Sequence, residues 1–182
     1  MRAPVSARTI SEKILSAKAG RDVRAGDVVM CDVDRMIGTD ASAPMAIDYF
    51  ERMGGRRLCD PSRVMFAFDH YSPATTGKTR GFHDRVREFA RLFGGELHES
   101  GEGISFQLAA ELGRVLPGNL VIGADSHTVT CGALNLFAVG VGSSDLAAAM
   151  ITGQVWLRVP GAIRVVLTGE RQPGVSAKDI AL

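Results

Sequence analysis

The sequence predicts an α/β protein with three layers, in which a mainly parallel sheet lies between helices on both of its faces. Short apolar runs at 64–68 and 120–122 are typical of buried strands, because they are too short to form helices of their own. Segments with helical spacing of apolar residues alternate with these runs along the chain. Such alternation is typical of strands that share one sheet and are covered by the helices between them.

The first part of the chain shows a helix, a strand and a loop. Thr9 and Glu12 fit a capping box at the start of a helix that ends near Gly20. A strand is predicted over 28–33, followed by a loop of small polar residues over 34–44. Loops at strand ends often carry functional residues, so this loop is a candidate part of a site.

That loop leads into a second helix. The helix is predicted over 45–53, with Ser42 as its cap and Gly54 at its end. Thr39 is a candidate substrate contact, and the role of Asp40 stays open at this point.

The rest of the chain continues the alternation. A helix over 82–93 carries His83, which we interpret as structural. The other predicted elements are strands over 96–100 and 162–167, a helix over 104–112, and a helix through about 152 with Ser143 or Ser144 as its cap. The glycine-rich stretch at 132–142 is expected either to pack under a ligand or to form a close helix contact.

The run at 120–122 is followed by two small residues and then by Asp125, Ser126 and His127. Residues two apart on a strand point to one face, so Asp125 and His127 would share a side. A carboxylate, a hydroxyl and an imidazole at a strand end can move protons and hold an oxygen-rich substrate. The plain alternative is a hydrogen-bonded turn, since short motifs often match by chance.

A second strand end carries the same kinds of residue. Asp69 and His70 follow the run at 64–68. Ligands of open α/β sheets bind outside the carboxyl ends of the strands. Two such ends side by side would form one polar site with two carboxylates and two imidazoles.

Composition narrows the class of protein. The net charge of +1 gives no reason to expect a nucleic acid or an acidic membrane surface as a partner. No apolar run approaches the ~18 residues of a membrane-spanning helix, and residues 1–8 lack the apolar core of a secretory signal. Cys31, Cys59 and Cys131 match no standard zinc or iron–sulfur spacing and suggest no disulfide framework, so we expect a cytoplasmic protein and assign no metal ligand.

The end of the chain resembles the start of another helix. Ser176 and Asp179 fit a helix N-terminus, yet the sequence stops at Leu182. We therefore expect residues 1–182 to be one α/β region that is incomplete relative to a longer protein.

Several motifs in order resemble the aconitase superfamily, and within it the 3-isopropylmalate dehydratase large subunits and homoaconitases. They are Thr9-Ile-Ser-Glu-Lys-Ile14, Thr39-Asp-Ala-Ser-Ala-Pro-Met-Ala-Ile47, Phe68-Asp-His70, Gly101-Glu-Gly-Ile104, Gly123-Ala-Asp-Ser-His-Thr128, Gly132-Ala133, Val139-Gly-Val-Gly-Ser-Ser-Asp145, Gly153-Gln-Val-Trp-Leu-Arg-Val-Pro160 and Val175-Ser-Ala-Lys-Asp-Ile180. An ordered set that runs nearly end to end is far more specific than any single motif.

The resemblance implies a hydro-lyase that dehydrates and rehydrates a hydroxy di- or tricarboxylate. It implies a 4Fe–4S cluster with one open iron, and a small swivelling domain that often belongs to a separate subunit. By position, Asp69 and His70 resemble the pair that assists the hydroxyl and the water. Asp125 and His127 resemble a second acid–imidazole pair, and Ser126 resembles a substrate contact.

The chain departs from the family pattern in three places. The segments that hold the family's cluster cysteines lie beyond this chain. Phe106 stands where the family usually has a histidine, and Cys131 stands where close relatives often have one. Two other functions therefore stay open: a degenerate or truncated paralogue that acts as a binding or assembly subunit, and a mononuclear metal hydrolase with Asp69, His70, Asp125 and His127 as ligands.

Overall fold

A five-stranded parallel sheet forms the centre of the fold, with the strand order β4-β3-β2-β5-β6. The structure is a computed structural model that describes residues 7–181. The strands are β2 (Arg35–Thr39), β3 (Val64–Ala67), β4 (Glu96–His98), β5 (Leu120–Gly123) and β6 (Phe137–Gly140). Every neighbouring pair in this sheet is parallel.

Both faces of this sheet are buried, because side chains alternate between them along each strand. On one face Met36, Phe66 and Ile122 belong to the larger core cluster. On the other face the neighbouring residues Ile37 and Val121 belong to a second cluster. The sheet therefore needs a helical layer on each side.

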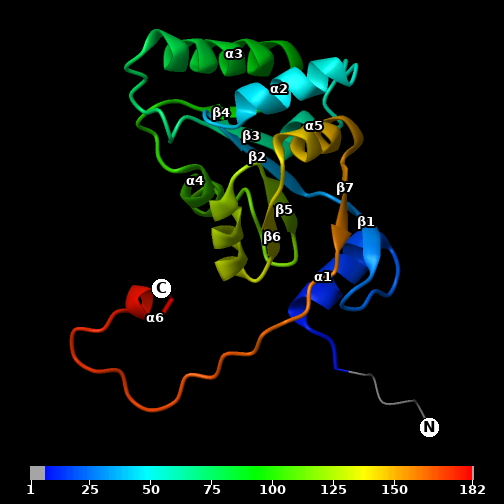
Figure 1. Cartoon of the computed structure of the whole chain (residues 1–182), viewed down its shortest axis with the longest axis vertical. Helices are drawn as coiled ribbons and strands as arrows, with labels where there is room; N and C mark the ends of the chain where they lie inside the picture. The colour runs from blue at the N-terminus through cyan, green and yellow to red at the C-terminus, as the bar shows by residue number, and fades with distance from the viewer. Residues whose placement is uncertain (1–6, 182) are drawn as a thin grey trace.

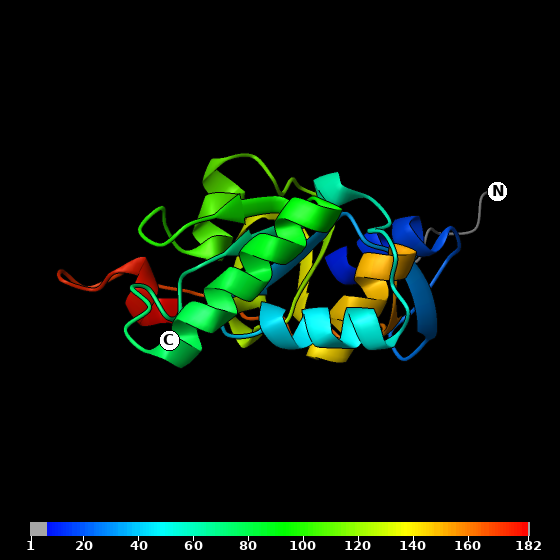
Figure 2. The same ribbon diagram turned by 90° about the horizontal axis from the view of Figure 1, so that it is seen from above.

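Two sets of helices supply these layers (Figures 1 and 2). The larger cluster is closed by α2 (Ala43–Arg52), α3 (Gly77–Phe93) and α5 (Ser143–Thr152). The second cluster is closed by α4 (Ser105–Glu111) and the 3₁₀ helix η2 (Ser126–Leu134). The predicted three-layer α/β/α class is confirmed.

A smaller two-stranded unit adjoins the sheet. It pairs β1 (Val28–Asp32) with β7 (Gln154–Arg158) in antiparallel register, and α1 (Ile10–Ala19) packs against β1. The predicted capping box is confirmed: Thr9 N donates to Glu12 Oε2 at 2.9 Å, and Glu12 N donates to Thr9 Oγ1 at 3.1 Å. A short 3₁₀ turn, η1 (Pro61–Arg63), precedes β3.

The prediction of a loop over 34–44 was wrong in its first half. Arg35–Thr39 is β2, the central strand of the sheet. Only Met36 and Ile37 are large and apolar there, so the run is too short to be recognised by its pattern. Pairing with β3 on one side and β5 on the other stabilises the strand in spite of that composition. The edge strand β6 was not predicted either.

Two helix caps also differ from expectation. The N-cap of α5 is Gly142, so Ser143 is the first helical residue and makes no capping bond. Ser42 does occupy the N-cap of α2, but its hydroxyl bonds to Thr39 instead of to the helix backbone. The helix bounds themselves agree with the predictions to within a few residues, apart from α3, which starts earlier, at Gly77 behind Thr76.

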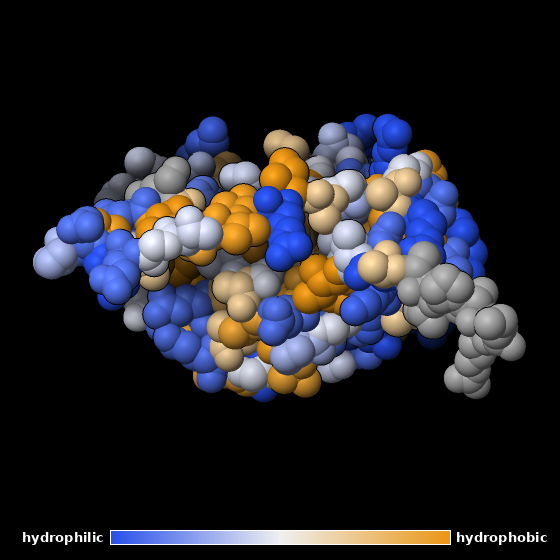
Figure 3. Space-filling view, turned by 90° about the horizontal axis from the view of Figure 1, so that it is seen from below, coloured by the Kyte–Doolittle hydropathy of each residue, from blue (hydrophilic) through white to orange (hydrophobic). Residues whose placement is uncertain are grey.

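The strand predicted over 162–167 does not form. Residues 159–168 have no regular secondary structure, and the side chain of Ile163 is 93% exposed. Within the described residues this segment pairs with no other strand, and a strand without a partner gains no ladder hydrogen bonds. Figure 3 shows the molecule from below, with apolar side chains on that face. Exposed apolar residues of the segment 162–167 are Ile163, Val165, Val166 and Leu167. The chain then ends in α6 (Ala177–Ala181), where Ser176 and Asp179 form the predicted helix start.

Among residues 7–181, no helix combines the length and the apolar character needed to cross a membrane.

Candidate active site

Three neighbouring strands each lead into an aspartate at the same edge of the sheet. Asp40 directly follows β2, while Asp69 and Asp125 lie two residues beyond β3 and β5. Because β3, β2 and β5 are adjacent and parallel, their carboxyl ends lie together. This edge is where ligands of open α/β sheets bind.

The imidazole of His70 lies between two of these carboxylates. Its Nδ1 is 2.7 Å from Asp69 Oδ1, and its Nε2 is 3.0 Å from Asp125 Oδ2. Nδ1 is hydrogen-bonded to Asp69, and Nε2 forms an ion pair with Asp125 when the ring carries its second proton. The geometry therefore favours the imidazolium form of His70.

The electrostatics of the site agree with this geometry. Burial by itself lowers the pKa of His70, but its hydrogen bond to Asp69 and the charges of Asp69, Asp125 and Asp40 together raise it. His70 thus holds a proton more tightly than a free imidazole, with 37% of its side chain still exposed. A retained proton on a partly exposed imidazole is available to a substrate.

Asp69 is held from a second direction. Its side chain is only 4% exposed, and its Oδ2 accepts a hydrogen bond of 2.7 Å from the backbone N of Ser105, the first residue of α4. One oxygen of Asp69 therefore faces His70 and the other is tied to α4.

Asp125 caps η2 instead of continuing the strand. The strand ends at Gly123, so the expected strand spacing of Asp125 and His127 is wrong. The two residues meet nonetheless, because Asp125 Oδ1 accepts from His127 N at 2.7 Å and lies 3.1 Å from His127 Nδ1. Burial raises the pKa of Asp125, but these bonds and the charges of His70 and His127 lower it overall.

Two glycines allow this close packing. A Cβ on Gly123 would lie 2.5 Å from Thr128 Oγ1, and a Cβ on Gly140 would lie 2.7 Å from the backbone O of Asp125. Both distances are far below contact, so only glycine fits. At Gly123 the close neighbour is Thr128 in η2, and at Gly140 it is Asp125 at the start of η2.

A cavity of about 650 Å³ opens beside these residues. All four predicted catalytic residues line it: Asp69, His70, Asp125 and His127. The rest of the lining is mainly apolar and comes from α4, the residue before it, and η2: Ile104, Phe106, Gln107, Ala110, Thr130, Cys131, Ala133 and Leu134. The cavity therefore joins a proton-handling edge to an apolar wall.

The two predicted substrate contacts lie elsewhere. Thr39 is buried, and its hydroxyl is 3.1 Å from Ser42 Oγ. Ser126 is exposed and lines a separate depression beside Gly140 and Gly142. Neither side chain lines the cavity that holds His70, and their substrate role remains a prediction.

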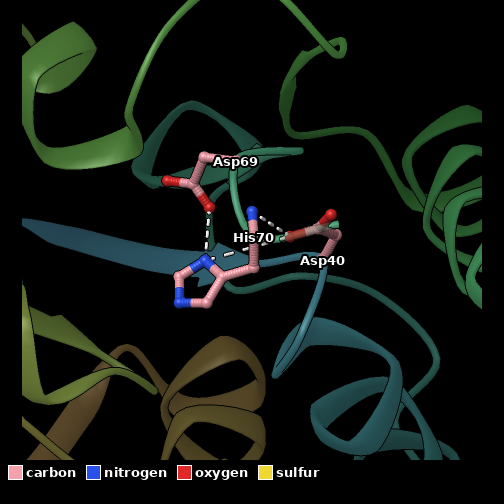
Figure 4. A group of neighbouring side chains, drawn as sticks. All are labelled: Asp40, Asp69 and His70. Carbon is pink, nitrogen blue, oxygen red and sulfur yellow. Dashed lines mark hydrogen bonds and ion pairs between the residues drawn. The ribbon is translucent and has the colours of Figure 1, made fainter. Parts of the chain in front are cut away.

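Sequence reasoning left the role of Asp40 open, and the structure places this residue under the site (Figure 4). Its Oδ1 accepts from His70 N at 2.9 Å. Its Oδ2 accepts from Tyr71 N at 2.8 Å and lies 2.9 Å from His83 Nε2. The signal was available, since Asp40 follows a strand as Asp69 and Asp125 do, but that strand had been interpreted as a loop.

Metal binding has little support among the described residues. Asp40, Asp69 and His70 are the one group there whose ligand atoms converge. Both oxygens of Asp40 are already hydrogen-bonded, and both nitrogens of His70 face carboxylates. A metal ligand needs a free lone pair on the imidazole, so this arrangement does not favour a mononuclear metal site.

The cysteines do not form a cluster site. Cys31 Sγ lies against Leu15 O, Cys59 Sγ lies against Ala149 O, and Cys131 lies in the second core cluster on the other side of the sheet. An iron–sulfur cluster is held by converging thiolates. Within residues 7–181 the cysteines do not fit such a group.

Comparison with known proteins decides the family. A model of the aconitase family (aconitate hydratase) matches residues 12–182. The chain belongs to the aconitase family.

Among relatives of this aconitase-family chain are several proteins named 3-isopropylmalate dehydratase large subunit. The one from Thermoanaerobacter sp. (strain X514) is 47% identical over 176 residues, and the one from Syntrophus aciditrophicus (strain SB) is 48% identical over 177 residues. A Pyrococcus furiosus protein named 3-isopropylmalate dehydratase large subunit 1 is 47% identical over 177 residues. Each match covers 96% of this chain and 42% of the relative, so the chain spans about two fifths of the length of these relatives.

Proposed function

We propose that this chain supplies acid–base residues of an aconitase-family hydro-lyase that acts on a hydroxy di- or tricarboxylate such as isopropylmalate. The observation that carries the proposal is the imidazole of His70, held between Asp69 and Asp125 at the wall of a cavity. Relatives named 3-isopropylmalate dehydratase large subunit give the substrate class its support.

Dehydration needs a proton at the leaving hydroxyl, because hydroxide is a poor leaving group. His70 is placed to donate that proton: its pKa is raised and its side chain is partly exposed to the cavity. As the C–O bond breaks, the hydroxyl leaves as water with the proton from His70, while a base takes the proton from the neighbouring carbon and the electrons of that C–H bond form the C=C bond. In the reverse direction His70 takes the proton back from the attacking water.

The two neighbouring acids orient His70 and stabilise its charged form. Asp69 faces Nδ1 and Asp125 faces Nε2, so the ring cannot rotate without losing a bond. His127 contacts Asp125, lines the cavity and has 78% of its side chain exposed. The Asp125–His127 pair is the second proton-handling group that we assign to this chain, and Ser126 and Thr39 remain proposed substrate contacts.

A 4Fe–4S cluster is the cofactor that we propose for the complete protein. When bound, such a cluster supplies a Lewis-acidic iron that polarises the hydroxyl. The cysteines described here do not converge, so its ligands would come from residues outside this chain. We also propose a small subunit as partner, a cytoplasmic location and a role in leucine biosynthesis.

The test uses the complete polypeptide, prepared without oxygen together with its small subunit. We expect turnover of isopropylmalate, and a loss of about 10²- to 10⁴-fold in kcat on His70→Asn, the range of general acid catalysis. His98→Gln is the matched control, because His98 is also bonded to two carboxylates but lies on β4 outside the cavity. Wild-type activity in His70→Asn would contradict the proposal.

The binding-subunit alternative has one observation in its favour. Phe106, which replaces the family's usual histidine, lines the cavity and cannot transfer a proton. A complete, cluster-loaded protein that binds a hydroxy acid without converting it would favour this alternative over the hydro-lyase.

A further inference from the structure

The buried pair of Asp40 and His83 is not used by the proposed proton transfer, yet it is joined directly to His70. Asp40 is fully buried, and three donors surround its carboxylate: the backbone N of His70, the backbone N of Tyr71 and, on the imidazole of His83, Nε2. Burying a carboxylate costs folding free energy unless its oxygens are hydrogen-bonded, so removing any of these three donors should destabilise the fold around Asp40.

His83 reaches Asp40 from a different layer of the fold. It lies on α3, is 3% exposed, and stacks on Phe68 with ring centroids 4.0 Å apart and planes 11° apart. The edge of the ring thus bonds to Asp40, while its face packs on the residue just before Asp69. One imidazole therefore makes two separable contacts, one polar and one apolar.

These contacts fix the backbone that carries the proposed acid. Asp40 belongs to the central strand end, and its two oxygens hold the amides of consecutive residues, His70 and Tyr71. With its backbone held in this way, the His70 ring lies 2.7 Å from Asp69 and 3.0 Å from Asp125. Figure 4 shows Asp40 beside the His70 backbone and Asp69 beside its ring.

We propose that Asp40 and His83 are positioning residues that hold His70 in line with Asp69 and Asp125. The proposal rests on the function proposed for His70. Asp40 and His83 do not line the cavity, so they would act through the backbone of His70. This extends the interpretation of His83 as merely structural.

Two substitutions separate the two contacts of His83. In His83→Gln the side chain can still donate to Asp40 but no longer stacks on Phe68. In His83→Phe the stacking on Phe68 is kept but no donor remains for Asp40. Positioning through Asp40 predicts that the Gln variant resembles the wild type and that the Phe variant does not.

The first readout is nitrogen NMR of the imidazoles in the 182-residue chain, which needs no catalytic activity. We expect His83→Phe to change the ring-nitrogen shifts and the titration of His70, and His83→Gln to leave them near those of the wild type. Asp40→Asn is a second variant, whose amide nitrogen cannot accept a bond, and it should change His70 in the same way. His98→Gln is the control for the loss of another buried histidine.

The second readout is the kinetics of the complete enzyme. A misplacement of about 1 Å can cost about 100-fold in rate, so we expect a 10- to 100-fold lower kcat for His83→Phe with KM changed less than about threefold. The Gln variant should stay within about threefold of the wild type in both parameters.

Opposite results would overturn the proposal. If His83→Phe is normal and His83→Gln is impaired, packing on Phe68 is what matters. Unchanged His70 signals in both His83→Phe and Asp40→Asn would exclude positioning altogether. If the complete wild-type enzyme lacks dehydratase activity, the proposed function fails, while the NMR result still decides whether Asp40 and His83 position His70.

Discussion

Replacing Gly140 by alanine tests how the end of β6 positions Asp125. Gly140 pairs with Gly123 at the end of the sheet, and an added Cβ would lie 2.7 Å from the backbone O of Asp125. It would also lie 3.4 Å from Ser126 Cα. The methyl group would therefore press on the residue that faces His70.

The size of the effect follows from these distances. Ordinary contact begins at 3.4 Å, so β6 and Asp125 must separate by about 0.7 Å. Overpacking of this kind costs about 1–3 kcal/mol of folding free energy. Asp125 Oδ2 lies 3.0 Å from His70 Nε2, so a shift taken up by Asp125 would weaken that ion pair, and in the complete enzyme we expect kcat to fall by about tenfold or more.

Urea unfolding and imidazole NMR measure the two consequences. Gly132→Ala is the matched control, because nothing lies within 4 Å of its added Cβ and its backbone is outside the left-handed region. The control should keep its stability or gain up to about 1 kcal/mol. If Gly140→Ala unfolds at the same urea concentration as Gly132→Ala and leaves the His70 signals unchanged, the reasoning about close packing is refuted.

Three other predictions concern His70, Phe106 and the cysteines. Burial lowers the pKa of His70, but the neighbouring carboxylates outweigh burial and raise this pKa above its ordinary value of 6.5. The free energy of unfolding should therefore fall as the pH rises from 6.5 through the raised pKa. Urea titrations at several pH values measure this fall, and His70→Asn should remove it. Under the proposed function, Phe106→His replaces an apolar cavity residue by a polar one and should lower the ratio of kcat/KM values for hydroxy acids with and without an alkyl branch by about tenfold. Burial raises the pKa of both the Cys59 and the Cys131 thiols, but Cys59 is exposed and should react with a disulfide reagent in the native chain, whereas Cys131 is buried and should react only on unfolding.

The polar ends of β3 and β5 could be predicted because strongly apolar runs marked both strands. Asp69 and Asp125 then followed from the rule that ligands of α/β sheets bind at strand ends. What could not be predicted is that one ring, His70, lies between them, because that depends on β2 separating β3 and β5 by the right width.

Asp40 shows why a central strand can be missed. Arg35 and Gly38 dilute the apolar pattern of β2, and its stability comes from the two strands on either side, which no local pattern reveals. The segment 162–167 shows the reverse error. Its residues have strong strand propensity, but among the described residues it has no partner strand, so propensity alone was not enough.

The three aspartates at one sheet edge have a consequence for how a substrate is held. Their negative charges outnumber the positive charge that His70 can carry, and the described lining of the cavity includes no lysine or arginine. A di- or tricarboxylate would be repelled by this edge, since like charges a few ångströms apart disfavour each other. The wall described here is therefore suited to delivering protons, and under the proposed function the cations that neutralise the substrate's carboxylates would come from outside this lining.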